Sequence, residues 1–343
     1  MQGFAFFRLP YGHQCFSLSG AVTTVADYAE LNGKSGFVVA PFSPSEDEPI
    51  LLIHDDHAEP STDVALPELQ HEQHERKDRE DYHNDFASFH SRLLHGDFSK
   101  LVLSRSIVLP RTEDDKPMAL FRKACQFYPR MFIALIYTPQ SGLWLTATPE
   151  VLLSGVDSQW QTMALAGTMP YADDIKWSEK NIEEQRYVAT YIVSQLERFT
   201  HDAKEEGPYT ARAGHLAHLR SDFRFTMKNP SDIGSLLKAL HPTPAVCGLP
   251  KEEAFRLICQ QEHHARSYYS GFMGPLRLTL SEEETSNAAT THLFVTLRCM
   301  QVFRNACRLY AGGGLLKDSV EEQEWQETET KLDTMRRVIA KTE

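Results

Sequence analysis

The sequence of 343 residues lacks the marks of a metal ribbon, a disulfide-rich domain or a membrane-spanning protein. Its six cysteines never fall at CxxC spacing, which disfavours a zinc ribbon and a dense disulfide framework and suits a reducing cytoplasm. No run approaches the roughly 18 uninterrupted apolar residues of a spanning helix, and the opening MQGFAFFRLP lacks the apolar segment of a signal peptide. We therefore expect a soluble cytoplasmic protein with reduced thiols.

Positive charge is also scarce. Lys and Arg together number 35, whereas Asp and Glu number 47, so the formal net charge is -12. This balance leaves no general basic surface that could follow a phosphate backbone, and an anionic membrane surface would repel the chain. We expect neither a nucleic acid nor a membrane as partner. An anionic small substrate would need a local cluster of cations.

The composition changes mainly once, in a polar stretch from His54 to Asp85 that contains several histidines. His71 and His74 stand at helical i, i+3 spacing, but no ligand quartet of recognisable spacing follows them. A solvated loop and helix face is the simpler interpretation of this stretch, and a metal site is the less favoured alternative.

Hydrophobic periodicity predicts many strands and fewer helices. The predicted strands lie near residues 36–42, 49–54, 100–109, 130–138, 142–155, 160–167, 221–228, 268–280 and 292–303. The predicted helices lie near residues 79–96, 117–128, 181–200, 232–241, 251–262 and 319–340. Consecutive strands joined by short turns favour antiparallel sheets backed by helices, an α+β arrangement, over strict βαβ alternation. A chain of this length can form one unit with a large core, and two domains are the alternative.

The last predicted helix has acidic residues on the side of its apolar stripe. At 100° per residue, Glu324 and Lys331 project within the stripe and Glu327 lies at its edge. In the helix that starts near residue 181, Glu184 lies on the apolar side whereas the adjacent Glu183 turns away. Acids on an apolar side need an explanation, because ordinary surface acids occupy the opposite face.

Two explanations fit these inward-facing acids. Burying a carboxylate without a partner costs several kcal/mol, so a positive group is expected where Glu184, Glu324 and Glu327 converge. With Lys331 the local charge would be -2, which a magnesium ion would cancel with the oxygen ligands that it prefers. The alternative is that the helix macrodipole favours these acids at helix N-termini, and that they only border the core.

Three other stretches contain residue types that chemistry uses. Lys100 opens a strand, and a desolvated lysine could serve as a general base, although a solvated lysine is the more common reading. Glu150 follows a proline between apolar strands and could be a half-buried acid or a turn residue that faces water. Gly312 to Gly314 lack the pattern of a nucleotide-binding loop, so the glycines are more consistent with close backbone approach to a small ligand or a bulge.

Seven short motifs occur in an order typical of one enzyme family: KLVLSR, ALAGTMP, LHPTPAVCGLP, YYSGFMG, LFVTLRC, LYAGGG and EWQETETKL. Over about residues 98 to 340 the chain resembles the chorismate-utilising enzymes, which include isochorismate, salicylate, anthranilate and aminodeoxychorismate synthases. The resemblance implies an α+β fold of two large stacked, mainly antiparallel sheets flanked by helices. It implies one domain over 1–343, in which 1–97 form a shortened, weakly matching N-terminal part and 98–340 the catalytic core.

The resemblance also implies roles for single residues. Lys100 matches the base that activates water, and Glu150 matches the acid that protonates the departing hydroxyl. Glu184 and Glu327 match magnesium ligands, and Glu324 matches an acid that contacts the ion directly or through water. The residues that match positions around the substrate are Gly167, Thr168, His241, Tyr269, Arg298, Gly312, Gly314 and Lys331. Asn181 departs from the family, because relatives often have an acid there.

Two positions distinguish the reactions catalysed by different members of the family that the chain resembles. Enzymes that use ammonia usually have glutamine at the position of Lys100, because ammonia needs no strong base whereas water does. Aminodeoxychorismate synthases place a lysine that attacks the ring at the position of Ala166. Both residues favour a water-using isochorismate synthase of menaquinone or siderophore synthesis, with chorismate as substrate, Mg²⁺ as cofactor and no glutaminase subunit. A salicylate synthase and a catalytically silent homologue are the alternatives.

Overall fold

The computed structural model describes residues 2–55, 69–72, 78–112, 114–280 and 288–339. The strands are β1 (Gln2–Arg8), β2 (Phe16–Val25), β3 (Gly36–Ala40), β4 (Ile50–Ile53), β5 (Lys100–Pro110), β6 (Phe132–Thr138), β7 (Gly142–Thr148), β8 (Val151–Val156), β9 (Gln159–Pro170), β10 (Lys204–Ala213), β11 (Leu216–Thr226), β12 (Gly248–Leu249), β13 (Phe272–Leu276), β14 (Thr290–Val295), β15 (Cys299–Val302) and β16 (Ala306–Leu315). The helices are η1 (Tyr28–Leu31), α1 (Asp78–His95), α2 (Pro117–Phe127), α3 (Glu179–Leu196), α4 (Ile233–Leu240), α5 (Lys251–Gln261) and α6 (Glu321–Ile339).

The strands form two large sheets that are hydrogen-bonded to each other through β2. The order is β10-β11-β9-β8-β14-β13-β3-β4-β2-β1-β6-β7-β15-β16-β5-β12, and every strand pair is antiparallel within the described residues. Residues 16–21 of β2 pair with β1, whereas residues 22–25 pair with β4. The single strand thus carries the chain from one sheet into the other.

Strand β6 shows why the fold has apolar layers on both sides of one sheet. Phe132, Ala134 and Ile136 contribute to the core cluster between the two sheets, while Ile133 and Leu135 contribute to a second cluster under α2 and α6. Because successive side chains of a strand point to opposite faces, a continuous apolar run such as this is buried on both sides.

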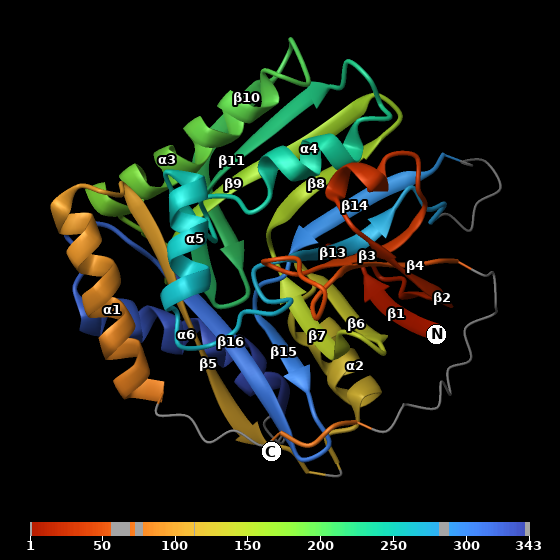
Figure 1. The fold of residues 1–343 in the computed structure, drawn as a ribbon, viewed down its shortest axis with the longest axis horizontal. Coiled ribbons are helices and arrows are strands. Elements are labelled where there is room, and N and C mark those ends of the chain that lie inside the picture. Colours follow the sequence, from red (N-terminus) through yellow and green to blue (C-terminus); the bar gives the residue numbers. More distant parts are fainter. Residues whose placement is uncertain (1, 56–68, 73–77, 113, 281–287, 340–343) are drawn as a thin grey trace.

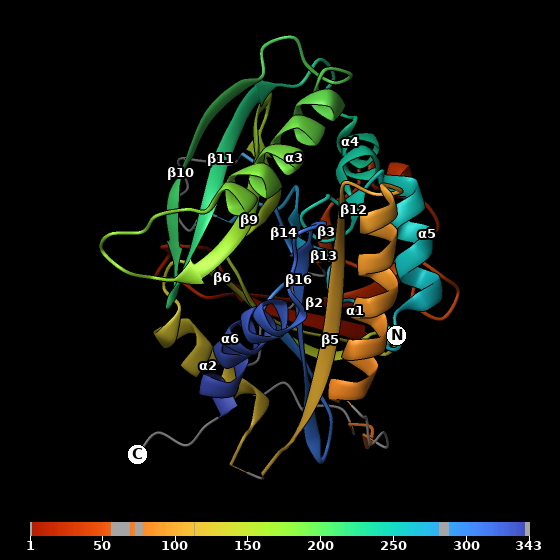
Figure 2. The ribbon, with the colours of Figure 1, turned by 90° about the vertical axis from the view of Figure 1, so that its left-hand side faces the viewer.

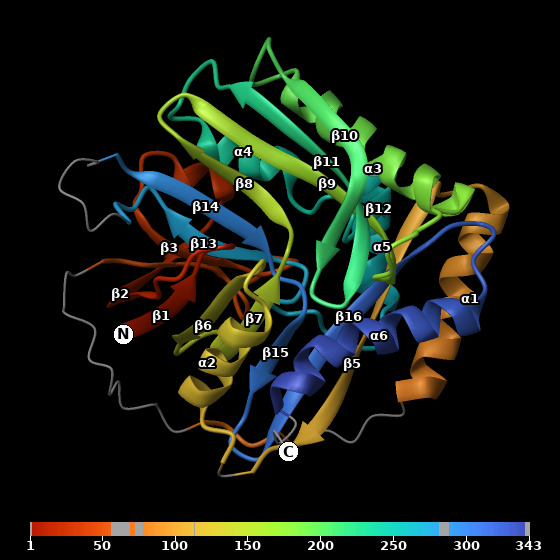
Figure 3. The ribbon, with the colours of Figure 1, turned by 180° about the vertical axis from the view of Figure 1, so that it is seen from behind.

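Helices pack on faces of both sheets, and α3 and α4 contribute to the same core cluster as Phe132, Ala134 and Ile136. Figure 2 shows α6 on one side of β5 and β16, with α1 and α5 on the other side. Seen from behind in Figure 3, α6 crosses over β16 while α3 lies along β9 and β11. Helices α3 and α6, which come from two distant segments of the chain, thus pack on β9 and β16 respectively (Figure 1).

The predicted α+β fold with stacked antiparallel sheets is confirmed, and the differences lie in strand boundaries. The run 142–155 is broken at Pro149 and Glu150, and the run 292–303 is broken at residues 296–298. Strands β1, β2, β10, β12 and β16 were not predicted. For β10 the reason is that it is almost fully exposed and so has no apolar face to detect. His74 lies outside the described residues, and no helix among those described is both long and apolar enough to cross a membrane.

Candidate active site

A small cavity collects most of the predicted site residues. Ten of them line it: Glu150, Gly167, Thr168, Glu184, Tyr269, Arg298, Gly312, Gly314, Glu327 and Lys331. They come from the β7–β8 turn, β9, α3, the segment before β13, the β14–β15 turn, β16 and α6. The three others are Lys100, which borders the cavity, Glu324, which lies beside it, and His241, which is elsewhere.

Lys100 is fully buried at the start of β5, so the solvated reading of this residue is excluded. Its Nζ atom lies 3.0 Å from Oε1 of Glu184, which projects from α3. A side chain at Gly314 would collide with both, since a Cβ there would lie 2.1 Å from Glu184 Oε1 and 2.9 Å from Lys100 Cε. The glycine in β16 therefore lets this ion pair reach the cavity.

Glu150 is held at the break between β7 and β8, with only 3% of its surface exposed. Its backbone N–H donates to Thr148 Oγ1 at 3.3 Å and its carbonyl accepts from Val295 N at 3.0 Å. Burial raises the pKa of the carboxyl from its usual value of 4.5 to about 7, although the charges of Arg298, Lys100 and Lys331 oppose the rise. Near neutral pH this carboxyl can therefore hold a proton and donate it.

A β-bulge shapes the opposite wall of the cavity. In the β9–β11 pair, Ala166 faces Leu219 and Met169 faces Ala217, so Gly167 and Thr168 together lie opposite the single residue His218. Gly167 adopts a φ of 69°, which suits glycine and would strain other residues. Bulges of this kind turn side chains and carbonyls away from the regular ladder, and this one turns them toward the cavity.

His218 connects the bulge to Arg298. The Nδ1 atom of His218 lies 3.0 Å from Gly167 O, and its Nε2 atom lies 3.2 Å from Nη2 of Arg298. Because the guanidinium can only donate, Nε2 is the acceptor and the Nδ1–H donates to Gly167 O. Burial and the Arg298 charge lower the pKa of His218 well below 6.5, which keeps the ring neutral in this bridging role.

Arg298 occupies a strained backbone position in the turn between β14 and β15. Its φ of 46° lies in the left-handed region, which costs a residue with a Cβ about 1–2 kcal/mol. A hydrogen bond from Ala147 N to Arg298 O, 3.0 Å long, holds the turn against β7. This turn conformation places the buried guanidinium at the cavity, where it can bind a carboxylate through two hydrogen bonds.

The glycines of β16 form the floor of the cavity. A Cβ at Gly312 would lie 2.7 Å from the hydroxyl of Tyr269, so glycine keeps that hydroxyl in the site. The Tyr269 ring stacks on Tyr310, and burial raises its pKa to about 12, so the hydroxyl stays protonated. Lys331 of α6 donates to Gly312 O at 2.7 Å and to Glu327 Oε1 at 2.6 Å. Cations and donors thus surround a space that suits an anion.

The acids from α3 and α6 face inward as the helical wheels predict. Glu184 and Glu324 are buried, whereas Glu183 and Glu322 on the outer faces are exposed. Three lysines pair with the inward acids: Lys100 with Glu184, Lys180 with Glu324 and Lys331 with Glu327.

The charged side chains of this group shift one another's pKa values. Burial and the nearby Glu327 raise the pKa of Glu324, although Lys180 opposes the rise. Burial also acts to raise the pKa of Glu184, but the charges of Lys100, Lys180 and Lys331 outweigh it and the pKa is lowered. A Cβ at Gly313 would lie 3.6 Å from Glu324 Oε2 and 3.9 Å from Glu327 Oε1, which places these two oxygens around one point.

The donor set fits a hard divalent cation. Glu324 Oε2 is buried and accepts no hydrogen bond from the described residues, so it has an unused lone pair beside Glu327. Carboxylate oxygens are the ligands that Mg²⁺ prefers. Within the described ranges, no three acidic, histidine or cysteine side chains are already gathered around one metal position. Because each glutamate is paired with a lysine, coordination would require these pairs to loosen.

His241 differs from the expectation, because it is not among the residues that line the cavity. Its ring packs edge-on against Tyr28 and Phe272, with centroids 5.6 Å and 5.1 Å away. Burial lowers its pKa to about 3, so the ring is neutral. Ala245 and Val246, which follow in the same motif, line the cavity instead.

The sequence analysis missed two residues of the site, His218 and Lys180. Lys180 stands four residues before Glu184 on one helix, so its place on the same face as Glu184 was a usable signal. His218 gave no such signal, because its role depends on the bulge in the partner strand.

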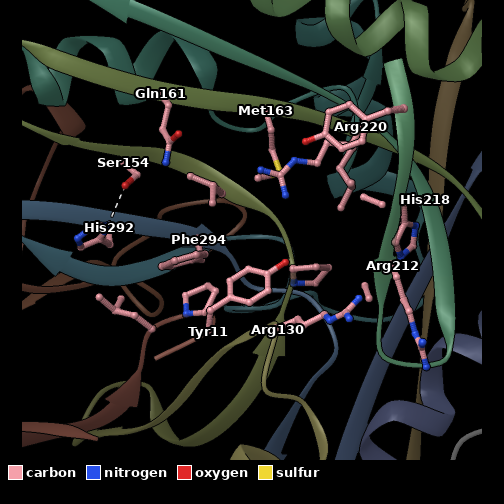
Figure 4. A pocket seen from close by; sticks show the side chains of 18 residues that line it. Tyr11, Arg130, Ser154, Gln161, Met163, Arg212, His218, Arg220, His292 and Phe294 are labelled. Carbon is pink, nitrogen blue, oxygen red and sulfur yellow. Dashed lines mark hydrogen bonds between the residues drawn. The ribbon is translucent and has the colours of Figure 1, made fainter. Parts of the chain in front are cut away.

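A larger cavity of about 420 Å³ lies next to this one and shares Leu165 and His218 with it. Figure 4 shows its lining, which includes Arg130, Arg212 and Arg220. It contains neither the buried carboxyl at position 150 nor any of the inward-facing acids. The smaller cavity is therefore the candidate active site, because the shifted acid, the buried lysine and the cations meet there.

The chain is similar to known proteins in both sequence and structure. Residues 48–340 match the family described as chorismate binding enzyme. The chain is 31% identical over 279 residues to the isochorismate synthase DhbC of Bacillus subtilis, covering 76% of this chain and 68% of that protein. It is 29% identical over 257 residues to the isochorismate synthase MenF of Escherichia coli, covering 72% of this chain and 57% of that protein.

Solved structures share the fold. The crystal structure of DhbC from Bacillus anthracis has a TM-score of 0.80 at 25% identity, covering 97% of this chain and 95% of that one. Anthranilate synthase component I from Streptococcus pneumoniae has a TM-score of 0.66 at 18% identity, covering 92% and 80% of the two chains. The second likeness concerns the fold alone.

Proposed function

Since the chain belongs to the family of chorismate-binding enzymes, we propose that it is an isochorismate synthase, which converts chorismate to isochorismate with the help of Mg²⁺. The observation that carries the proposal is the meeting, at one cavity, of a fully buried lysine and a buried carboxyl whose pKa is about 7. Addition of water to one carbon and loss of hydroxide from another need such a base and such an acid.

The proposed reaction conserves all atoms. Lys100 takes a proton from a water molecule as its oxygen bonds to C2 of the ring, and the two ring double bonds shift. The C4–oxygen bond breaks as Glu150 gives its proton to the departing hydroxyl, which leaves as water. One water enters and one leaves, so substrate and product are isomers, and the enolpyruvyl ether remains attached.

The cationic groups of the cavity suit the two carboxylates of chorismate. Arg298 and the Tyr269 hydroxyl would hold the enolpyruvyl carboxylate, with Gly312 and Gly314 allowing close approach of the backbone. Gly167, Thr168 and Lys331 would surround the remaining substrate oxygens. His218 acts as a positioning residue, because it contacts Arg298 and Gly167.

Water, and no amine of the enzyme, is the proposed nucleophile. Ala166 lines the cavity, so no side-chain amine projects from that position of β9. Its methyl group leaves room for a water molecule at C2 of the ring. We propose that the enzyme works in the cytoplasm without a glutaminase subunit, in keeping with its six free cysteines and its use of water.

Mg²⁺ would be held by Glu184 and Glu327, with Glu324 as a direct or water-mediated ligand. Such an ion would supply the positive charge that neutralises the ring carboxylate of the substrate.

The direct test is incubation of the protein with chorismate and Mg²⁺, followed by product identification and a pyruvate assay. Isochorismate without pyruvate is the expected result. Salicylate with pyruvate would identify a salicylate synthase instead, a requirement for ammonia would indicate an anthranilate-type enzyme, and no turnover would indicate a silent homologue.

The pH dependence of kcat/KM should report Glu150. Because burial raises its pKa to about 7, the carboxyl is protonated below that pH and loses its proton above it. We expect log(kcat/KM) to fall with a slope near -1 above about pH 7. A profile that stays flat between pH 6 and about pH 9 would contradict the role of Glu150 as general acid.

Binding of Mg²⁺ should be measurable without turnover. Saturating MgCl2 should raise the unfolding temperature of the protein by about 2 °C or more, because the ion binds only the native state. Glu327→Gln should weaken this binding by about 100-fold, whereas Glu322→Gln on the exposed face of α6 should not change it. Equal Mg²⁺ affinities in the two variants would remove Glu327 from the ligand set.

A further inference from the structure

Lys180 stands in a position that its own helix does not favour. It lies in the first turn of α3, where the helix macrodipole repels a cation. Its Nζ atom forms an ion pair with Glu324 of α6, a residue with only 1% of its surface exposed. The place of Lys180 is therefore explained by the carboxylates of α6 and not by the helix that carries it.

The three lysines that neutralise the inward acids differ in their freedom to leave. The side chain of Lys100 is 0% exposed and that of Lys331 is 9% exposed, whereas that of Lys180 is 29% exposed. Lys331 is additionally fixed by its hydrogen bond to Gly312 O. Lys180 is the member of this group that can turn into solvent without disturbing the strands beneath the cavity.

The Lys180 ammonium also lies beside the acidic residues of α6. It pairs with Glu324 of α6, and Glu327 stands three residues further along the same helix, so a second carboxylate lies beside the first. One oxygen of Glu324 is paired with Lys180, while the other, Oε2, is buried without a hydrogen bond from the described residues and faces the same point near Gly313 as Glu327 Oε1. A cation that reached this point would lie near carboxylate oxygens of both residues.

We infer that Lys180 competes with the divalent cation for Glu324 and so sets the affinity and charge selectivity of the cation site. The inference rests on the Mg²⁺ site of the proposed function. An ion of charge +2 gains more from three carboxylates than an ammonium does and can displace it, whereas a monovalent ion has no such advantage. Displacement sends the Lys180 side chain into solvent and frees Oε1 of Glu324, so that both carboxylate oxygens are available to the ion.

The test is calorimetric titration of the full-length protein with MgCl2 in the absence of chorismate. Lys180→Met should tighten Mg²⁺ binding by about tenfold or more, since the Lys180–Glu324 ion pair no longer has to be broken and one fewer positive charge repels the ion. Lys180→Arg, which keeps the charge, should bind Mg²⁺ with an affinity near that of the wild type. Arg186→Met removes one charge from the exposed face of the same helix and controls for net charge.

A second set of variants, made in Glu324→Gln protein, tests whether Glu324 is the group for which Lys180 and the ion compete. In Glu324→Gln protein, Lys180→Met should change Mg²⁺ affinity by less than about twofold, because the contested carboxylate is gone. Equal saturable binding of Mg²⁺ by wild type and Lys180→Met would overturn the inference and leave the metal site standing. No Mg²⁺ binding by any variant would overturn the metal assignment and the inference together.

Discussion

Glu150→Gln is expected to lower kcat by about 10²–10⁴-fold while the fold is retained, the range associated with the loss of a general acid. Glutamine has nearly the same shape and can still donate a hydrogen bond, but it has no proton to give to the departing hydroxyl. The measurement is steady-state turnover of chorismate with saturating Mg²⁺. Turnover near that of the wild type would contradict the assignment of Glu150.

The same substitution should raise stability above pH 7. The native carboxyl, with a pKa near 7, holds its proton between pH 4.5 and 7, where the unfolded chain has released it, so stability falls as pH rises through this window. Glu150→Gln removes this pH-dependent loss in the free energy of unfolding, which amounts to about 3 kcal/mol once the pH is well above 7. Urea unfolding at pH 5 and about pH 8 measures it. Glu183→Gln, an exposed change on α3, is the control that should alter neither turnover nor stability.

Lys100→Gln should also lower kcat by about 10²–10⁴-fold, because Lys100 is the proposed base that accepts a proton from water. Glutamine can still donate a hydrogen bond to Glu184, so the buried carboxylate keeps a partner. Lys100→Ala should be less stable than Lys100→Gln by about 3–5 kcal/mol, since it leaves a buried charge unpaired. Activity and unfolding measurements on both variants separate the catalytic role from the structural one.

An exposed lysine gives the matched control for this experiment. Lys176→Gln lies in the segment before α3, where the side chain is on the surface, and should retain full turnover. A Lys100→Gln enzyme that turns over chorismate as fast as Lys176→Gln would remove Lys100 from the reaction and leave the activating base unidentified.

The parts of the site that follow local periodicity could be predicted from the sequence. The helical wheels select Glu184 over its neighbour Glu183 and put Glu324 on the buried side of α6, and the structure has both residues buried. One helix fixes which of its own faces is apolar, so these choices needed no knowledge of the tertiary fold. The antiparallel α+β class followed for a similar reason, from short turns between successive strands.

The remaining features depend on contacts between distant segments, which periodicity does not encode. The bulge at Gly167 and Thr168 exists only in relation to the register of β11, so the place of His218 in the site could not be read from its own strand. His241 was expected in the site from the motif around it, but it fills a space between aromatic rings in the core. The pairing of Lys180 with Glu324 likewise joins two helices that are far apart in the sequence.

The most direct measurement of the central claim uses water labelled with a heavy oxygen isotope. If Lys100 activates solvent water for attack at C2 while Glu150 protonates the C4 hydroxyl, isochorismate formed in labelled water must carry the label in its C2 hydroxyl. Mass spectrometry of the product and of recovered chorismate gives the result after a short incubation. Isochorismate without label at C2 would mean that the hydroxyl migrates within the substrate, and would contradict the roles proposed for both residues.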